Sequence, residues 1–431
     1  MHTLIHFLIL MLPFLIEARN LVSHVSFEAE LIRRDSPLSS NFYTSMTPQE
    51  LQWRESLGSV SLGHNIRLSP TYFDQKDVKA DLIPNGGDYL MKFSLGTPPV
   101  EFTSVIDSGS DLVWVQCSPC ERCIAHESPL FEPNNSSTYC AIPCNSQSCT
   151  YPDFDSGCIP KAYHNNGNAS CVYNAVYGDG TKSMGVLSTD TISFPSAGAS
   201  HVSFPSSTFG CGYDQQGRLG IHGDGIVGLG LGSLSLVSQL GPNINYKFSY
   251  CLTPLHSNVN GKLKFGVDLK GPGVVSTPFK TQDPPTFYIL SLNDISIGNT
   301  TVAVSQDMII DSGTTLTFLP TSVYDSVKTA VKGAIKLSSV PDPNQAFDPC
   351  YEVKPSGEGF NPPDIVFHFK GADVVLKAEN TFRTLKNLTC MAIVPSDDSF
   401  LFGNIAQVNF EVVYDLKAKQ ISFAAADCTK N

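Results

Sequence analysis

Two short stretches of this chain share a pattern of residues that could do chemistry. Residues 105–110 read Val-Ile-Asp-Ser-Gly-Ser, and residues 309–314, in the second half of the chain, read Ile-Ile-Asp-Ser-Gly-Thr. In both, two apolar residues predict a short buried strand that ends at an aspartate, Asp107 or Asp311. A carboxylate in such a place needs hydrogen bonds or a shifted pKa. The adjoining hydroxyl groups supply hydrogen bonds, and the glycine lets the backbone turn tightly around the acid.

A third Asp-Ser-Gly sequence shows which part of the pattern carries information. Residues 155–157 also read Asp-Ser-Gly, but Pro152 lies close by, Cys158 follows, and no apolar strand leads into the aspartate. This copy predicts an ordinary turn. The longer pattern occurs once in each half of the chain, so we interpret Asp107 and Asp311 as a pair of carboxylates rather than as two unrelated strand-to-turn junctions.

The composition limits the class of protein. The chain has 431 residues and a formal net charge of −12, with 16% charged residues and many glycines and prolines. This length predicts two or three domains. The acidic charge argues against nucleic acid or an anionic membrane as a partner, and the frequent turn residues favour a β-rich protein. Most of the 13 cysteines lie in residues 117–171, which indicates an oxidising compartment.

The N-terminal residues predict segments that are removed from the mature protein. An apolar run at residues 7–16 is too short to span a bilayer and predicts a secretory signal peptide at 1–18, with an uncleaved membrane anchor as the alternative. Residues 19–80 hold no cysteine and contain Arg33-Arg34, and we interpret them as a removable prosegment rather than an ordinary N-terminal arm. No later stretch predicts a membrane span, so we expect a secreted protein without stable membrane insertion.

From residue 88 onward the pattern predicts strands and turns, and it repeats. Residues 172–177 and 185–192 read as the strands of a hairpin around the turn Gly178-Asp179-Gly180. In the second half, residues 322–337 predict an amphipathic helix. Leu401-Phe402-Gly403 repeats the apolar-apolar-glycine sequence of residues 226–228. The repetition predicts two similar lobes, which we place at residues 81–265 and 266–431.

Several of these motifs together resemble the pepsin-like aspartic endopeptidases. The resemblance rests on the two Asp-Ser-Gly-Ser/Thr motifs, the apolar-apolar-Gly sequence after each, and the Tyr-Gly hairpin between them. The cysteine-rich insert at 117–171, Phe209-Gly210-Cys211-Gly212, residues 248–251 and residues 413–416 resemble the nepenthesin-type branch of plants, which has no saposin-like insertion. Ser108 stands where the family more often has threonine, but the hydroxyl group is kept.

The resemblance implies a fold and an activity. The expected fold is all-β: a bilobal, pepsin-like double β-barrel with few short helices and an active-site cleft between the lobes. The expected activity is hydrolysis of protein or peptide substrates at acidic pH, by a secreted monomer that needs no metal and no cofactor. The apoplast is the expected compartment, with the vacuole as the alternative. A second function from another class stays open, a catalytically weak pepsin-like protein that acts as an inhibitor or recognition protein.

The resemblance also implies a role for each residue of the site. Asp107 and Asp311 share one proton and activate a water molecule, since two close carboxylates cannot both ionise easily. Ser108 and Ser312 tie the two loops together, while Ser110 and Thr314 bond the outer carboxylate oxygens beside Gly109 and Gly313. Tyr177 and Gly178 belong to a flap at 172–192, and Trp114 is the expected hydrogen-bond partner of Tyr177. The alternatives are an ordinary hairpin aromatic for Tyr177 and a plain core residue for Trp114.

The cysteines allow two interpretations. Cys117-x-x-Cys120-x-x-Cys123 with His126 nearby has the spacing of a zinc site, but behind a signal peptide disulfides are favoured. Spacing alone leaves the connectivity open. The resemblance implies six pairs and leaves Cys140 over, as a free thiol or an intermolecular link. The pairs are Cys117–Cys120, Cys123–Cys211, Cys144–Cys171, Cys149–Cys158, Cys251–Cys428 and Cys350–Cys390. Sequons that predict glycans lie at Asn134 or Asn135, Asn168, Asn299 and Asn387.

Overall fold

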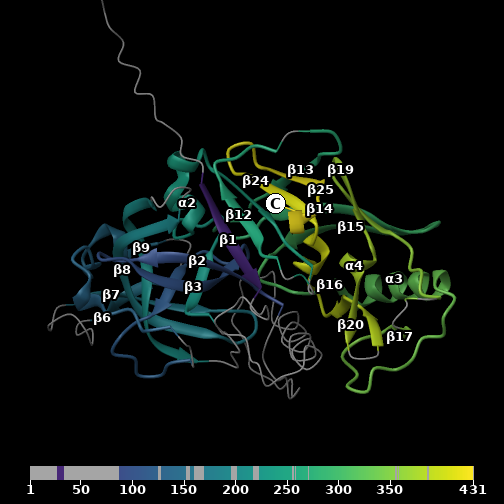
Figure 1. Ribbon diagram of the computed structural model, residues 1–431, viewed down its shortest axis with the longest axis horizontal. Helices are drawn as coiled ribbons and strands as arrows, with labels where there is room; N and C mark the ends of the chain where they lie inside the picture. Colours follow the sequence, from purple (N-terminus) through teal and green to yellow (C-terminus); the bar gives the residue numbers. More distant parts are fainter. Residues whose placement is uncertain are drawn as a thin grey trace, which may run out of the picture.

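The structure, a computed structural model, describes residues 27–33, 87–124, 128–151, 156–159, 169–195, 201–216, 223–254, 257, 259–269, 271–354, 357, 359–385 and 388–430. The predicted signal peptide, the predicted prosegment apart from residues 27–33, and the sequons at Asn168 and Asn387 lie outside the described residues. The fold is all-β with few helices, as predicted, and two lobes flank a shared sheet (Figure 1).

The N-terminal lobe is built around two long antiparallel strands, β8 (Lys182–Pro195) and β9 (His201–Gln216). Their register shifts twice, which bends the pair around the core. The predicted hairpin is present, because β7 (Ser170–Val176) pairs with β8. The other elements of this lobe are β2 (Tyr89–Leu95), β3 (Val100–Asp107), β4 (Val113–Gln116), β5 (Cys140–Ala141), β6 (Ser156–Ile159), β10 (Gly225–Gly228), α2 (Leu236–Leu240), and the 3-10 turns η1 (Pro133–Asn135), η2 (Gln147–Cys149) and η3 (Gly241–Ile244).

The C-terminal lobe is organised by a second long antiparallel pair, β14 (Ile289–Ile297) and β15 (Thr300–Ile310). A small separate sheet holds β17 (Cys350–Glu352), β20 (Phe382–Leu385) and β21 (Leu388–Met391). The other elements are β16 (Thr317–Pro320), α3 (Thr321–Ala334), β18 (Ile365–Phe369), β19 (Ala372–Leu376), α4 (Ala378–Thr381), β22 (Ile393–Ser396), β23 (Leu401–Phe402), η4 (Ile405–Gln407) and η5 (Cys428–Lys430).

The sheet between the lobes joins distant parts of the chain. It runs in the order β2, β1, β12, β11, β24, β25 and β13. β1 (Phe27–Arg33) comes from the predicted prosegment and lies in the middle of Figure 1, paired on one edge with β12 and on the other with β2. The remaining strands are β11 (Lys247–Cys251), β12 (Gly261–Phe265), β13 (Val275–Lys280), β24 (Phe410–Asp415) and β25 (Gln420–Ala425).

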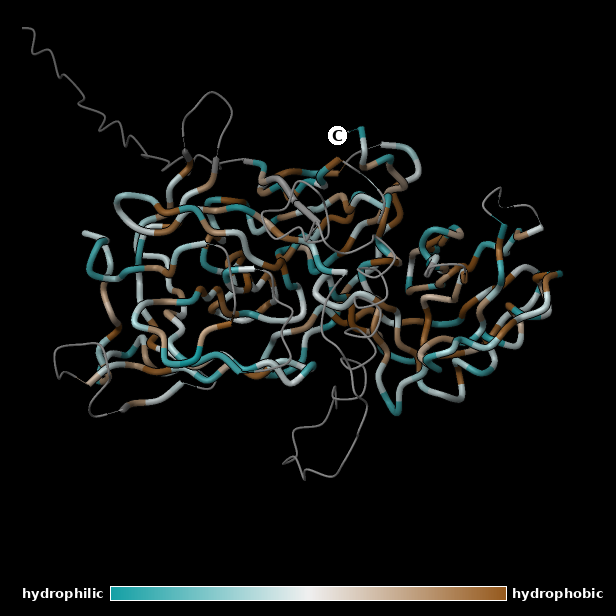
Figure 2. The backbone as a smooth tube through the Cα atoms, turned by 60° about the horizontal axis from the view of Figure 1, so that its bottom comes forward, coloured by the Kyte–Doolittle hydropathy of each residue, from teal (hydrophilic) through white to brown (hydrophobic). Residues whose placement is uncertain are grey.

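Apolar side chains on one face of each strand form the core. β12, β18 and β19 alternate between buried and more exposed residues. Hydrophobic and hydrophilic residues alternate along many parts of the chain in Figure 2. Under the shared sheet, the ring of Phe248 stacks on Tyr414 with centroids 4.4 Å apart, and Tyr288 meets Tyr414 edge-on at 4.6 Å. The hydroxyl of Tyr288 donates to the carbonyl oxygen of Leu229 at 2.8 Å, which joins this ring cluster to the N-terminal lobe.

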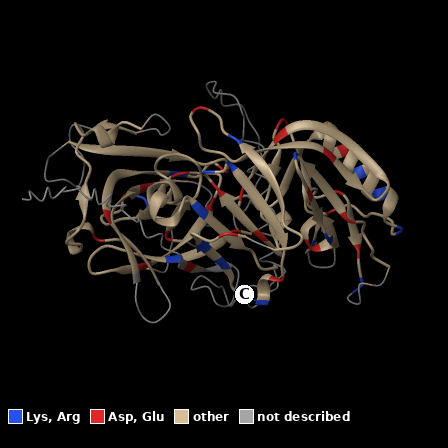
Figure 3. Ribbon diagram, turned by 90° about the horizontal axis from the view of Figure 1, so that it is seen from above, with Lys and Arg blue, Asp and Glu red and all other residues tan. Residues whose placement is uncertain are grey.

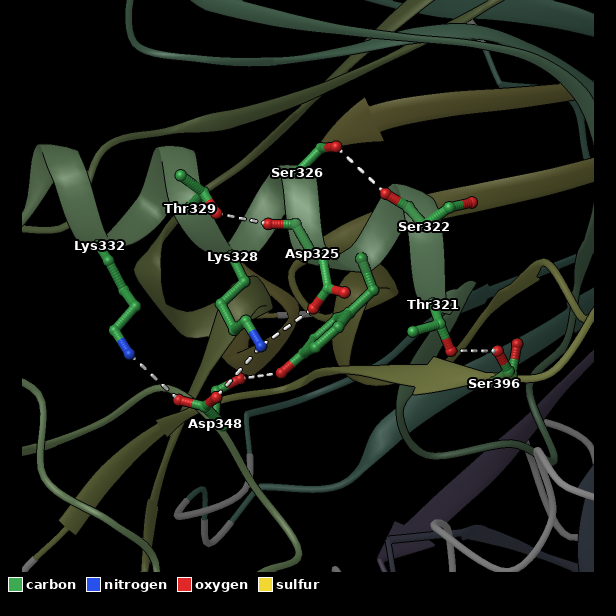
Figure 4. A network of polar contacts seen from close by, with 10 residues as sticks. Thr321, Ser322, Asp325, Ser326, Lys328, Thr329, Lys332, Asp348 and Ser396 are labelled. Atoms are coloured by element: carbon green, nitrogen blue, oxygen red, sulfur yellow. Dashed lines mark hydrogen bonds and ion pairs between the residues drawn. The ribbon is translucent and has the colours of Figure 1, made fainter.

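Helix α3 follows the predicted amphipathic pattern. Tyr324, Val327 and Val331 are buried against the C-terminal lobe, while Lys328 and Lys332 reach Asp348 on the outer side at 3.3 and 3.5 Å (Figure 4). The helix ends at Ala334 and not at residue 337 as predicted, because Ile335 turns into an extended conformation and enters the core. Elsewhere, basic and acidic residues are interspersed along the ribbon (Figure 3).

Candidate active site

Both aspartates of the repeated motif lie where a strand of each lobe ends. Asp107 is the last residue of β3, and Asp311 directly follows β15. A parallel partner strand supports each one: β10 lies beside β3 with Gly228 opposite Asp107, and β23 lies beside β15. The two apolar-apolar-glycine sequences are therefore the partners of the two aspartate strands, which explains why the sequence repeats them together.

The oxygens of each carboxylate are held by its own loop in the same way. In both loops the amide N–H two residues after the aspartate donates to Oδ1, at 2.9 Å in the first loop and 2.8 Å in the second. The hydroxyl group three residues after the aspartate donates to Oδ2. The donors are Gly109 and Ser110 for Asp107, and Gly313 and Thr314 for Asp311.

Two serines lock the loops to each other across the junction of the lobes. The amide of Ser108 donates to the hydroxyl of Ser312 at 3.0 Å, and the amide of Ser312 donates to the hydroxyl of Ser108 at 2.9 Å. Both serines are fully buried. This reciprocal pair fixes the two aspartates relative to each other, since each serine is the residue directly after an aspartate.

The glycines of the two loops have no room for a side chain. A Cβ atom on Gly109 would lie 2.7 to 2.9 Å from three carboxylate atoms of Asp311. A Cβ atom on Gly313 would meet the carboxylate of Asp107, with Cγ at 2.8 Å. Each carboxylate therefore lies against the backbone of the opposite loop. Glycine is required at these two positions because the opposite carboxylate leaves no space for a Cβ atom, and not because of an unusual backbone conformation.

The electrostatics fit a pair that shares a proton. Asp107 and Asp311 are 8% and 7% exposed, so water reaches each carboxylate while most of its solvation is lost. Burial, followed by the nearby charge of Asp311, raises the pKa of Asp107 well above its usual value. The hydrogen bonds from Ser110 and Gly109 oppose that shift without cancelling it. A proton is thus retained in the pair at pH values where an ordinary aspartate would have lost it.

The predicted flap brings Tyr177 within electrostatic range of Asp107. The indole N–H of Trp114, on β4, donates to the Tyr177 hydroxyl at 2.7 Å, and the two form a satellite core with the base of the hairpin. Tyr177 begins the tight turn between β7 and β8, and Gly178 follows it. Burial and the charge of Asp107 raise the pKa of the Tyr177 hydroxyl well above its usual value, so it is an uncharged donor near the dyad.

Comparison with known proteins decides the family. Family models described as xylanase inhibitor N-terminal and xylanase inhibitor C-terminal match residues 89–267 and 287–425. A probable aspartic protease of Arabidopsis thaliana is 38% identical over 94% of both chains, and nepenthesin-1 of Nepenthes gracilis is 37% identical over 84% of this chain and 83% of its own. The chain belongs to the plant pepsin-like aspartic proteases. It is thus related to aspartic-type endopeptidases along nearly its whole length.

Solved structures share the fold of this aspartic protease at low sequence identity. Basic 7S globulin from soybean has a TM-score of 0.64 and 19% identity over 80% of this chain and 95% of its own. Conglutin gamma from lupine seeds has a TM-score of 0.65 and 20% identity over 79% and 92%. At this identity the likeness shows the bilobal fold alone.

The protease also has site residues that the sequence analysis did not single out. The amide of Gln407 donates to the main-chain oxygens of Asp311, Phe402 and Gly403, at 3.2, 3.0 and 3.1 Å. The amide of Asn404 donates to Ser312 O at 3.0 Å and to Gly87 O at 2.8 Å. Both side chains are fully buried behind the second aspartate loop. Their only signal in the sequence was their place just after Leu401-Phe402-Gly403.

Two of the six predicted disulfides of this protease have the predicted partners, and four were wrong. The structure joins Cys251 to Cys428 and Cys350 to Cys390. In place of Cys117–Cys120 and Cys123–Cys211 it joins Cys117 to Cys211 and Cys120 to Cys123. The reason is strand pairing: β4 runs beside β9 with Val115 opposite Cys211, which brings Cys117 within 5.4 Å of Cys211 between Cα atoms.

The other correction in the insert follows burial. In place of Cys144–Cys171 and Cys149–Cys158, the structure joins Cys149 to Cys171 and Cys144 to Cys158. Cys149 and Cys171 are both buried in the satellite core below the flap, whereas Cys158 is exposed. The two buried cysteines, Cys149 and Cys171, therefore bond each other, and the two outer cysteines, Cys144 and Cys158, form the other disulfide. Cys140 is the free cysteine within the described part of the chain, and it is exposed.

The predicted glycosylation sites that the structure describes lie on the surface. Asn134, Asn135 and Asn299 are exposed, so their sequons are accessible. Cys117, Cys120 and Cys123 are all in disulfides, and a disulfide sulfur is no thiolate ligand for zinc. Within the described ranges we find no group of three His, Cys, Asp or Glu side chains that could hold a metal, and no helix suited to cross a membrane.

Proposed function

We propose that this protein is a secreted aspartic endopeptidase that hydrolyses peptide bonds in protein substrates at acidic pH. The observation that carries the proposal is the symmetry of the dyad. The two carboxylates accept matching hydrogen bonds from their own loops. Each carboxylate lies against the glycine of the opposite loop, and two serines join the loops through reciprocal hydrogen bonds. Such a pair activates water with no further group, because one carboxylate accepts a proton while the other supplies one.

In the proposed reaction the dyad holds a water molecule between Asp107 and Asp311 and starts with one shared proton. The ionised carboxylate takes a proton from the water, and the water oxygen attacks the carbonyl carbon of the scissile bond. The protonated carboxylate donates to the carbonyl oxygen as negative charge develops there. When the tetrahedral intermediate collapses, one carboxylate gives its proton to the leaving amine and the other takes a hydroxyl proton from the intermediate, which restores the single shared proton. Tyr177 and Trp114 close the flap over the substrate and exclude bulk water.

We further propose that the chain is made as a precursor. The predicted signal peptide at 1–18 directs secretion to the apoplast, and the prosegment at 19–80 keeps the precursor inactive. Strand β1 belongs to that prosegment and fills a place between β2 and β12, so its removal also requires this sheet to rearrange. N-terminal sequencing of active enzyme is expected to start between about residues 75 and 88. An active form that keeps residue 30 would exclude removal.

The test of the activity is a digest of an unbiased peptide library by the acid-processed protein, from about pH 2 to about pH 8. Wild type, Asp107→Asn and Asp311→Asn are compared, each with and without the transition-state mimic pepstatin. We expect a bell-shaped profile with an optimum at roughly pH 3 to 5, set by the two macroscopic pKa values of the pair. Both asparagine variants lose nearly all turnover. Cleavage that persists in either variant, or that only a serine-directed reagent stops, contradicts the proposal.

One observation favours a second function. The matching family models are described as domains of xylanase inhibitors, so this fold also serves proteins that bind other enzymes. In this candidate function the protein binds a glycoside hydrolase and blocks it without cleaving peptides. The intact dyad and flap favour the protease. A processed protein that cleaves no library peptide at any pH, yet lowers xylanase activity stoichiometrically, would decide for the inhibitor.

A further inference from the structure

Residues 228–232, with the sequence Gly-Leu-Gly-Leu-Gly, lie between the first aspartate loop and the C-terminal lobe, and we call them the glycine segment. The amide N–H of Leu229 donates to the main-chain oxygen of Asp107 at 2.8 Å. The amide N–H of Gly230 donates to the main-chain oxygen of Ser110, also at 2.8 Å. The segment is therefore bonded at two points to the backbone of the loop that carries the first carboxylate.

The same segment is bonded to the C-terminal lobe. The amide N–H of Leu231 donates to the main-chain oxygen of Thr286 at 2.9 Å. The hydroxyl of Tyr288 donates to the main-chain oxygen of Leu229 at 2.8 Å. The main-chain oxygen of Tyr288 accepts the amide N–H of Ile310, the residue directly before the second aspartate, at 3.1 Å. A continuous series of hydrogen bonds thus leads from the first aspartate loop, through the glycine segment, to the strand that ends at the second.

The side chain of Asp111 holds the end of the glycine segment against the first loop. It is 6% exposed, and its Oδ1 atom accepts the amide N–H of Gly232 at 2.7 Å. A Cβ atom on Gly232 would lie 2.4 Å from Oδ2, and a Cβ atom on Gly230 would lie 2.4 Å from Oδ1. Neither glycine has a positive φ. Glycine is required at both positions because the carboxylate occupies the space of a side chain.

The two aspartate loops receive their polar support from opposite partners. Behind the second loop, Asn404 and Gln407 donate from the following segment to main-chain oxygens of the loop. The glycine segment takes that place in the first half and has no polar side chain. There the loop itself supplies the polar group, Asp111, whereas the second loop has Thr315 at this position of the motif. This exchange gives a physical reason why the repeated motif differs at its fifth residue.

We propose that Asp111 is a positioning residue for the dyad, which holds the glycine segment in place between the lobes and so fixes Asp107 relative to Asp311. The inference rests on the proposed protease function and deepens it. Without the carboxylate of Asp111, the buried N–H of Gly232 has no acceptor and the segment shifts into the space that the carboxylate leaves. The first aspartate loop shifts with it, because its backbone is bonded to the same segment.

The test compares Asp111→Ala with wild type in steady-state cleavage by acid-processed enzyme. We expect kcat to fall about fivefold or more with KM little changed, since about 1 kcal/mol gives a factor of about five at 25 °C. The matched control is Asp342→Ala, in the loop between α3 and β17. Asp342 is also buried, and its carboxylate accepts three backbone N–H groups of its own loop, those of Asn344, Ala346 and Phe347. The control lowers the melting temperature at least as much and keeps the wild-type kcat.

A second variant, Gly232→Ala, tests the contact itself. The three atoms nearest to the added Cβ all belong to the carboxylate of Asp111, so we expect kcat to fall in the wild-type background. In the Asp111→Ala background these atoms are gone, and the same change costs about twofold or less. Equal costs in both backgrounds would contradict the contact. Gly232→Ala replaces Asp111→Ala in all assays if the latter does not fold.

Hydrogen exchange followed by mass spectrometry reads the positioning without turnover. We expect Asp111→Ala to accelerate exchange in peptides that contain residues 107–112, 228–232 and 309–312, and Asp342→Ala to leave these peptides unchanged. A wild type that cleaves nothing refutes the proposed function, and the exchange still decides about Asp111. The inference is overturned if Asp111→Ala leaves the exchange of residues 107–112 unchanged. In an active enzyme it is also overturned if Asp111→Ala keeps the wild-type kcat, or if Asp342→Ala lowers kcat equally.

Discussion

The closeness of the two loops predicts the effect of a single methyl group at Gly109. The added Cβ atom of Gly109→Ala would lie 2.7 Å from Oδ2 of Asp311, about 0.7 Å short of the 3.4 Å at which ordinary contact begins. The backbone of Gly109 does not have a positive φ, so alanine fits the local conformation, and the three nearest atoms to its Cβ all belong to the opposite carboxylate. A misplacement of about 1 Å costs roughly a hundredfold in rate. We therefore expect kcat to fall on the order of tenfold to a hundredfold.

The assay is steady-state cleavage of a library peptide by acid-processed enzyme, with the melting temperature measured in parallel. The matched control is Gly333→Ala on the exposed side of α3, where an added Cβ meets nothing within 4 Å. Glycine within a helix costs about 0.5 to 1 kcal/mol against alanine, so the control gains stability and keeps its activity. A Gly109→Ala enzyme with wild-type kcat and an unchanged pH profile would show that the loops are not in contact as described.

Three further predictions address the flap, the dyad and the cysteines. Tyr177→Phe leaves the buried N–H of Trp114 without its acceptor, which costs about 1 to 3 kcal/mol and lowers kcat/KM between about fivefold and a hundredfold; in the Trp114→Phe background the same change has a smaller effect. Asp107→Asn melts at a higher temperature than wild type near neutral pH, and the difference closes as the pH falls. The folded state binds the Asp107 proton more tightly than the unfolded chain, so wild-type stability is lost as pH rises through the raised pKa. Equal melting temperatures at every pH would contradict that shift. Non-reducing peptide mapping is expected to find Cys117 joined to Cys211, and an alkylating reagent is expected to modify Cys140 alone. A peptide that joins Cys117 to Cys120 would contradict the pairing.

The chemistry of the site could be predicted from the sequence because it depends on residues that are close neighbours in the chain. The aspartate, the hydroxyls and the glycine of each loop stand next to one another, and each bonds within its own loop. The contact between the loops was predicted only through the resemblance, since no local rule places Ser108 beside Ser312. Tyr177 and Trp114 lie on different strands, and their bond also followed only from the family.

The parts that could not be predicted depend on packing between distant strands. Gln407 lies 96 residues after Asp311, and its role requires η4 to fold back behind the second loop. The disulfides of the insert fail for a related reason, because spacing says nothing about which cysteines end up buried. Cys171 faces Cys158 across the β6–β7 pair, yet it bonds Cys149 on the buried side. The outcome is decided by which face of the hairpin packs on the satellite core.

The two halves of the dyad are alike in sequence but differ in surroundings, and this difference bears on how they divide their work. The hydroxyl of Ser312 donates to the carbonyl oxygen of Ile106 at 3.4 Å. The main-chain oxygen of Asp311 accepts from the side-chain amide of Gln407, whereas that of Asp107 accepts from the backbone amide of Leu229. The charge of Asp107 contributes to the raised pKa of the flap residue Tyr177. Two identical carboxylates in identical surroundings would exchange roles freely. An asymmetric setting gives the shared proton a preferred side.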